Sequence, residues 1–100
     1  MPKGYWVASV DVTDAEGYKA YIAANAEAFR KYGARFLTRG GKSEDLEGKL
    51  RSRVVVIEFP NFDAALTCYR SPEYDKARKL RQGISIADLV VVDGYDGPQP

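Results

Sequence analysis

The sequence predicts one α+β domain with the element order βαββαβ, in which a four-stranded antiparallel sheet carries two helices on one face. Four short segments rich in β-branched and aromatic residues are typical of strands. Between them, two longer segments repeat apolar residues every three or four positions, as amphipathic helices do. Two right-handed β-α-β connections that share one hairpin produce this arrangement, which is known as ferredoxin-like.

The first half of the chain contains a strand, a helix and a second strand. Residues 4–11 predict the first strand because aromatic and β-branched side chains dominate them. The helix is expected to start at Thr13, which fits a capping box with Glu16 three positions later. Gly33 ends the helix, since glycine readily adopts the left-handed conformation, and residues 34–39 predict the second strand.

The second half follows a polar, glycine-containing connection over residues 40–49. Residues 51–59 predict the third strand. The helix that comes next is expected to break and restart at Ser71 and Pro72, because proline disfavours helical geometry at the residue before it. Residues 88–95 predict the last strand.

Length and composition fit a single domain over residues 1–97, followed by a flexible tail over residues 98–100. The chain has 15 Lys and Arg against 14 Asp and Glu, a balance that argues against nucleic acid as a partner. No apolar run is long enough to span a bilayer, and no signal peptide is recognisable. We therefore expect no membrane partner and a cytoplasmic location, which the single cysteine, Cys68, also fits.

The sequence contains no histidine, and this absence excludes several classes of site. It removes catalysis by Ser-His-Asp and Cys-His groups, the usual haem ligand, and most zinc and non-haem iron sites. Cys68 has no histidine beside it and is expected to be a small core residue. We expect no metal and no cofactor.

The predicted strands carry apolar side chains on both faces of the sheet. In the third strand, Val55 and Ile57 belong to one face, while Val54 and Val56 belong to the other. Two helices cover only one face, so the second would expose a contiguous apolar patch. The simplest arrangement that buries it is a homodimer packed sheet against sheet. The alternative is that residues 40–49 or the C-terminal tail fold over this face.

A series of short motifs extends from the first predicted strand to the last. In chain order they are Gly4-Tyr5-Trp6, Ala23-Ala24-Asn25, Lys31-Tyr32-Gly33, Phe36-Leu37, Arg39-Gly40-Gly41, Val55-Val56-Ile57-Glu58-Phe59-Pro60, Cys68-Tyr69, Ser71-Pro72-Glu73-Tyr74, Leu80-Arg81 and Gly94-Tyr95-Asp96-Gly97. This series resembles a family of short bacterial proteins known as a domain of unknown function, within the dimeric α/β barrel superfamily. The resemblance implies a ferredoxin-like protomer whose sheet packs on a partner's sheet. It implies no single activity, because the superfamily includes cofactor-free monooxygenases, lactone isomerases, haem enzymes and small-molecule sensors.

Candidate ligand-binding residues are polar or aromatic side chains within otherwise apolar patterns. Asn25 lies in the apolar stripe of the first helix, where its amide either makes a structural hydrogen bond or faces a ligand. Arg39 and Arg81 are candidate anion-binding residues, although Arg81 alternatively interacts with a helix dipole. Glu58 is a candidate base or ion-pair partner. The aromatic candidates are Trp6, Tyr69 and Tyr74.

Two hypotheses for function are open at this stage. The first is a cofactor-independent enzyme, of monooxygenase or isomerase type, that positions a small organic metabolite and stabilises an enolate or similar anion. The second is a small-molecule binding or structural dimer module without turnover. A deep pocket that contains Asn25 and an arginine favours the first, whereas a helix–sheet layer filled by aromatic rings favours the second.

We expect the purified protein to contain no stoichiometric transition metal, because the chain has no histidine and one cysteine. Elemental analysis after purification without added metal measures this directly. Zinc, iron or copper at about one atom per chain would contradict the expectation.

Overall fold

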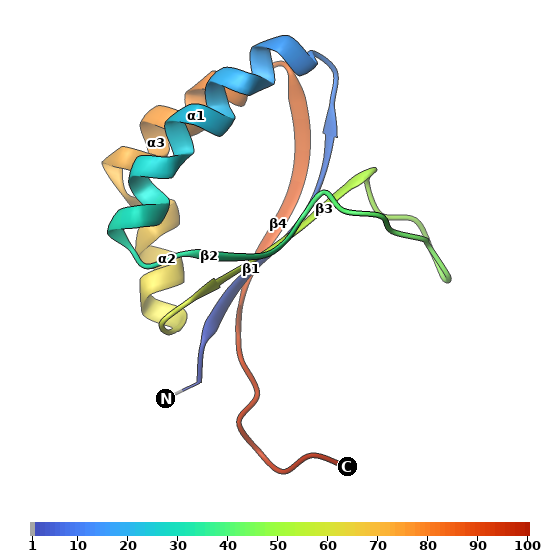
Figure 1. Ribbon diagram of the computed structural model, residues 1–100, viewed down its shortest axis with the longest axis vertical. Helices are drawn as coiled ribbons and strands as arrows, with labels where there is room; N and C mark the ends of the chain where they lie inside the picture. The colour runs from blue at the N-terminus through green and yellow to red at the C-terminus, as the bar shows by residue number, and fades with distance from the viewer. Residues whose placement is uncertain (1) are drawn as a thin grey trace.

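The computed structural model describes residues 2–100 and arranges them as a helical layer on a sheet (Figure 1). In chain order the elements are β1 (Gly4–Val12), α1 (Ala15–Lys31), β2 (Arg35–Arg39), β3 (Arg53–Phe59), α2 (Phe62–Arg70), α3 (Pro72–Arg78), the 3₁₀ turn η1 (Lys79–Arg81) and β4 (Ser85–Asp93). The strand order is β2-β3-β1-β4, and all neighbouring strands are antiparallel. The predicted ferredoxin-like arrangement is confirmed. β4 begins earlier than predicted because β1 pairs with it as far as Ser85.

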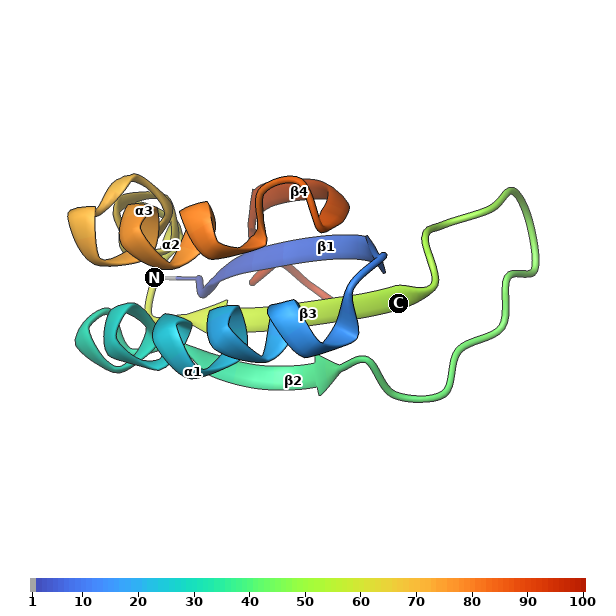
Figure 2. The same cartoon turned by 90° about the horizontal axis from the view of Figure 1, so that it is seen from above.

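The helices all cover the same face of the sheet, and the core lies between the two layers (Figures 1 and 2). Trp6 of β1 is 2% exposed, and its indole Nε1 donates a hydrogen bond to the Ala65 carbonyl of α2 at 2.7 Å. Its ring centroid lies 5.3 Å from that of Phe29, 5.3 Å from that of Phe59 and 4.9 Å from that of Tyr74. Each such aromatic pair contributes about 0.5–1.5 kcal/mol beyond its buried area. Trp6 therefore joins β1 to three helices at once.

α1 begins one residue later than the capping box predicts. The Asp14 side chain, rather than that of Thr13, accepts a hydrogen bond from the Gly17 amide at 3.1 Å. The Thr13 amide donates to the Ile84 carbonyl at 2.9 Å, which holds Thr13 against the end of the sheet. In a capping box the Glu16 carboxylate would accept a hydrogen bond from the Thr13 amide, but that amide is already bonded to Ile84.

The second helical segment is divided at Ser71, as the Ser-Pro pair predicts. The Ser71 hydroxyl donates to the Cys68 carbonyl at 2.7 Å and accepts from the Tyr74 amide at 3.1 Å. One side chain therefore ends α2 and begins α3, with Pro72 at the first helical position of α3. This break directs Tyr74, which is 1% exposed, against the Trp6 ring.

The opposite face of the sheet carries no helix in the described part of the chain. Val7, Val90 and Val92 lie on this face and are 38%, 55% and 43% exposed. The connection over residues 40–52 projects outward on this side, and the C-terminal segment leads away from the sheet (Figures 1 and 2). At the end of this connection Arg51 pairs with Asp11 and Asp88, and Leu50 borders the same groove as Val7 and Val90, so one end of the face is partly covered. The three valines nevertheless stay exposed, and the covering that the alternative to a dimer requires is incomplete. We call this surface the open face.

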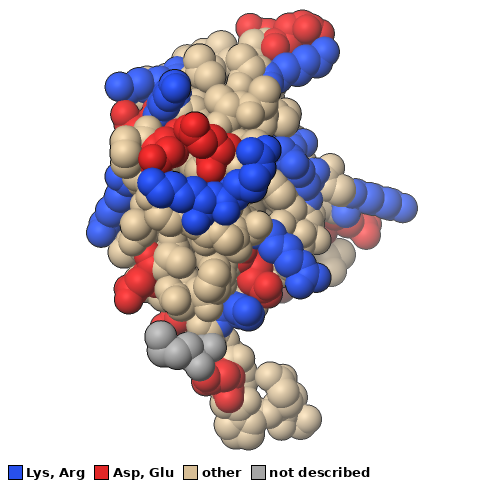
Figure 3. Space-filling model, turned by 60° about the vertical axis from the view of Figure 1, so that its left-hand side comes forward, with Lys and Arg blue, Asp and Glu red and all other residues tan. Residues whose placement is uncertain are grey.

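The surface over the helices mixes charges of both signs (Figure 3). Lys31 pairs with Glu73 at 3.1 Å, and Asp75 pairs with Arg78 at 2.9 Å. Positive and negative side chains lie next to one another there, as the balanced composition predicts. No helix within residues 2–100 has the length and apolar character needed to cross a membrane.

Replacing Ser71 with Ala should lower the free energy of unfolding by about 1–3 kcal/mol, because the hydroxyl is buried and both of its partners would lose a hydrogen bond. Asp14→Ala is the matched control, since it removes an exposed cap and should cost only about 0.5–1 kcal/mol. Chemical denaturation measures both values. Equal losses would show that the double hydrogen bond of Ser71 has no special weight.

Candidate functional site

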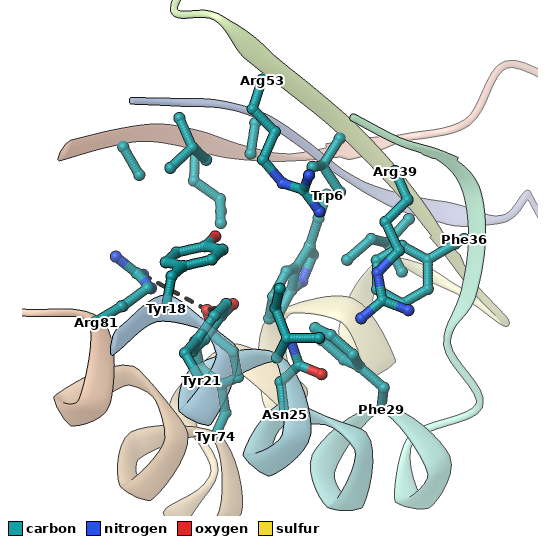
Figure 4. Close-up of a pocket in the computed structure, with 17 residues that line it drawn as sticks. Trp6, Tyr18, Tyr21, Asn25, Phe29, Phe36, Arg39, Arg53, Tyr74 and Arg81 are labelled. Carbon is teal, nitrogen blue, oxygen red and sulfur yellow. Dashed lines mark hydrogen bonds between the residues drawn. The ribbon is translucent and has the colours of Figure 1, made fainter. Parts of the chain in front are cut away.

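A cavity of about 40 Å³ lies between the helices and the sheet (Figure 4). This is room for about three water molecules or a small organic group. Its walls are the aromatic rings of Trp6, Phe29 and Phe36 together with aliphatic side chains of the sheet. The polar side chains that line it are Tyr18, Tyr21, Asn25, Arg39, Arg53, Tyr74 and Arg81. None of the 17 lining residues is Asp or Glu.

Three guanidinium groups reach this cavity from three different elements. Arg39 comes from β2, Arg53 from β3 and Arg81 from η1, and Figure 4 shows them on different sides of the same space. None of them forms an ion pair with an Asp or Glu of residues 2–100, whereas Arg51, outside the cavity, pairs with two aspartates. The cavity therefore has a positive charge that no acidic side chain of residues 2–100 pairs with.

A β-bulge in β2 turns Arg39 toward the helices. Phe36 pairs with Ile57 and Arg39 pairs with Val55, so β2 contains one extra residue, around Leu37, between these two pairs. Val55 and Ile57 both face the helices, and consequently Phe36 and Arg39 do too. In a regular strand Arg39 would instead share the open face with Leu37. The Arg39 guanidinium stacks over the Phe36 ring, 4.0 Å from its centroid.

Arg53, the first residue of β3, enters the cavity because it pairs with the inward-facing Val10. Its Nε atom is buried and has no hydrogen-bond partner among the described residues. Gly40 lies directly against it: a Cβ atom at this position would overlap the guanidinium, and the φ of +73° also favours glycine. A buried, unpaired N–H is costly, so Arg53 is suited to an acceptor supplied by water or a ligand.

Two tyrosine hydroxyls form a short chain with Arg81. Arg81 Nη2 donates to the Tyr74 hydroxyl at 3.5 Å, and the Tyr74 and Tyr21 hydroxyls are 2.7 Å apart. If Tyr74 donates onward to Tyr21, the Tyr21 proton is free to point at an acceptor in the cavity. Burial raises the pKa of Tyr21 and of Tyr74, so both hydroxyls are protonated donors at neutral pH. The Asn25 amide, which is 4% exposed, lowers the pKa of Tyr21, but by less than burial raises it.

The cavity collects most of the candidates predicted from the sequence. Those that line it are Trp6, Asn25, Arg39, Tyr74 and Arg81. Trp6 contributes only its ring, because its N–H is bonded to the backbone of α2. Glu58 lies elsewhere: it accepts a hydrogen bond from Tyr5 at 3.3 Å and lies 4.0 Å from Arg35. Tyr69 packs edge-on against the Trp6 ring, behind the wall of the cavity.

Sequence reasoning did not single out Tyr18, Tyr21 or Arg53 as site residues. The two tyrosines were recognisable as part of the α1 stripe, but nothing in the stripe separates a ring that closes the core from one that borders a cavity. Arg53 had a usable signal, since it alternates in step with Val55 and Ile57 and so belongs to their face.

Other reactive groups lie outside this arrangement. Cys68 is fully buried, and burial raises the pKa of its thiol to about 12, which suppresses thiolate chemistry. Within residues 2–100, no group of three or more Cys, Asp and Glu side chains is placed to hold a metal ion.

Comparisons with known proteins give a family and a fold. A family model described as "Domain of unknown function (DUF1330)" matches residues 3–95. No curated protein was found whose sequence matches this chain. A solved protein of unknown function from Rhodopseudomonas palustris has a TM-score of 0.75 at 21% identity, with 96% of this chain and 85% of that chain covered.

Two further solved structures share the fold at lower identity. SnoaB, a cofactor-independent oxygenase from Streptomyces nogalater, has a TM-score of 0.63 at 14% identity, with 100% of this chain and 97% of that chain covered. A dimeric protein of unknown function and ferredoxin-like fold from Bacteroides fragilis has a TM-score of 0.55 at 16% identity, with 91% and 95% covered. These identities establish a common fold and nothing more.

Protein stability should be constant between about pH 6 and 8 and should fall above about pH 9–10, where unfolded Cys and Tyr begin to ionise. The pKa values of Tyr18, Tyr21, Tyr74 and Cys68 are raised mainly by burial. The folded state therefore keeps protons that the unfolded chain loses, and stability is lost as the pH rises. Denaturation midpoints across this range measure the effect, and Tyr21→Phe should make the decline shallower. A decline already present between pH 6 and 8 would contradict this account.

Proposed function

The chain belongs to the DUF1330 family, and we propose that it works as a homodimer in which each protomer holds a small organic metabolite in the cavity and acts on it without a metal or organic cofactor. The observation that carries the proposal is the cavity lining, in which the Asn25 amide, the Tyr21 hydroxyl and arginine N–H groups border a space walled by rings. A pocket with these groups is what the enzyme hypothesis predicts. The fold shared with SnoaB, described as a cofactor-independent oxygenase, supports the same class.

The lining suits chemistry that passes through an organic anion. Donors held in a water-poor space stabilise negative charge as it develops on a carbonyl oxygen, because the low dielectric strengthens each hydrogen bond. The lining contains no Asp, Glu or His that would serve as a base at neutral pH. The substrate that fits is therefore an acidic enol or phenol that releases its own proton to water. Isomerisation then needs only the return of a proton at another atom. Oxygenation needs dioxygen as co-substrate: one oxygen atom enters the substrate, and the other leaves as water with two electrons and two protons that the substrate itself supplies.

The size of the cavity favours a second candidate, a binding module without turnover. A space of about 40 Å³ admits only a few heavy atoms, whereas ligand pockets usually measure several hundred Å³. The Arg39 side chain, which is largely exposed, is the wall element most free to move and enlarge the space. Mass spectrometry of bound compounds before and after incubation with dioxygen separates the two candidates, since only the enzyme changes the mass or structure of its ligand.

Asn25→Leu tests whether the buried amide serves a ligand. We expect the variant to keep its stability within about 1 kcal/mol, because polar groups held for function are often costly to the fold. Small carboxylates and phenols should raise the melting temperature of the wild type and raise that of the variant less. Glu58→Gln, outside the cavity, is the control and should respond like the wild type. A loss of about 1–3 kcal/mol in Asn25→Leu, with no compound shifting the wild type, would assign the amide a structural role.

The homodimer is proposed to form by packing of two open faces. The exposed valines of β1 and β4 form an apolar surface that soluble monomers rarely leave uncovered, and the similar structure from Bacteroides fragilis is described as dimeric. A two-fold axis through this face would bury the same side chains on both protomers.

Light scattering should therefore find a dimer at micromolar concentration. Val90→Lys places a charge in the proposed interface and should produce monomer or aggregate. Leu80→Lys is the matched control, since Leu80 is 45% exposed but lies in η1 on the helical side. A well-behaved monomeric wild type would refute the proposed interface.

A further inference from the structure

No carboxylate of residues 2–100 forms an ion pair with the positive charge of the cavity. Arg39, Arg53 and Arg81 approach one space, and repulsion between like charges opposes this arrangement. Three of the five other arginines, Arg35, Arg51 and Arg78, lie beside carboxylates, and Arg51 is 2.9 Å from Asp88, for example. The other two, Arg30 and Arg70, are exposed to solvent. Arginines placed for stability would be expected to have such partners.

Contacts with aromatic rings leave the donor edges of these guanidinium groups available. Arg39 lies over the Phe36 ring, and Arg81 lies 5.5 Å from the centroid of the Tyr21 ring. Where a guanidinium lies flat on a ring, its N–H bonds lie in the plane of the group and point outward from the edge. Arg81 donates one N–H to the Tyr74 hydroxyl, and the Arg53 Nε–H has no acceptor among the described residues.

The ring walls and the arginine N–H groups of the cavity together indicate which kind of ligand would fit. Planar, two-oxygen groups match the fork of a guanidinium, because two parallel N–H bonds meet the two oxygens. The rings of Trp6 and Phe29 would receive an apolar body attached to such a group. The volume of about 40 Å³ suits a carboxylate with few carbon atoms better than a tetrahedral phosphate ester.

We infer that the cavity is a binding site for a small organic carboxylate, held by Arg53 with Arg39 and Arg81. The inference rests on the proposed function and narrows its ligand to compounds with a permanent negative charge. The bulge at Leu37 and the glycine at position 40 build the site, since the first turns Arg39 inward and the second leaves space for the Arg53 guanidinium.

Calorimetric titration with matched pairs of probes tests the inference. The pairs are acetate and acetamide, propionate and propionamide, and benzoate and benzamide, with inorganic phosphate as a further anion. At least one carboxylate should bind, and its amide should bind at least about tenfold more weakly, since a charge-assisted hydrogen bond is roughly twice as strong as a neutral one. The affinity should fall as salt is raised.

Arg53→Met removes the charge while keeping an unbranched side chain. It should weaken carboxylate binding about tenfold or more and leave the melting temperature unchanged or higher, because an unpaired buried group is lost. Arg70→Met, at an exposed position of α2 outside the cavity, should change neither quantity. If Arg53→Met melts earlier and binds the carboxylate normally, Arg53 is structural and the inference is overturned.

The remaining outcomes separate the inference from the proposed function. Binding of an amide with no binding of its carboxylate would overturn the inference and leave the proposed function standing. Phosphate binding as tight as that of every carboxylate would overturn the carboxylate class in favour of a general anion site. Absence of binding by all probes, together with no thermal shift by any phenol, would overturn both.

Discussion

The Trp6 ring sets the distance between the helices and the sheet, and the cavity exists because that distance is fixed. Its N–H is bonded to the α2 backbone at 2.7 Å, and rings from α1, β3 and α3 surround it. These contacts hold the two layers a full ring apart. Next to the rings around Trp6, the layer between helices and sheet is lined by arginine and tyrosine side chains. These polar side chains do not fill the space, and the cavity remains between them. The packing that stabilises the fold therefore also keeps the cavity open.

The charged side chains that line the cavity lower the stability of the folded state. Buried donors without acceptors and like charges without counter-charges both oppose folding. A natural protein tolerates such features most readily where a ligand offsets them, and functional sites are commonly less than optimal for stability. Arg53 illustrates this balance, since its Nε is buried without a partner while Gly40 leaves room for the rest of the group. The open face is a comparable case on the other side of the sheet, where exposed valines are costly and the proposed second protomer would bury them.

Much of the architecture follows from local pattern. Apolar periodicity placed all four strands and both helical segments, and the Ser-Pro pair placed the break that directs Tyr74 inward. The stripe of α1 also placed Asn25 on the buried side. These features depend on neighbours along the chain, so one sequence suffices to predict them.

The features that create the site depend on pairing between distant segments. The bulge near Leu37 is defined by the pairing of β2 with β3, which the sequence of β2 alone does not reveal. Strict alternation along β2 would place Arg39 on the open face instead of the face that the helices cover. The capping box fails for a similar reason, because the distant Ile84 carbonyl occupies the Thr13 amide that Glu16 would bind, and Asp14 caps the helix instead. The sequence could place Arg53 on the inner face, but it could not show that the guanidinium would lie against Gly40 or that the buried Nε would lack a hydrogen-bond partner among the described residues.

A crystal structure determined in the presence of propionate tests the central claim most directly. The account predicts a carboxylate in the cavity, with one oxygen about 2.7–2.9 Å from Arg53 Nε, the distance of a charge-assisted hydrogen bond. A cavity occupied only by water, with Arg53 Nε bonded to a protein acceptor, would contradict the account.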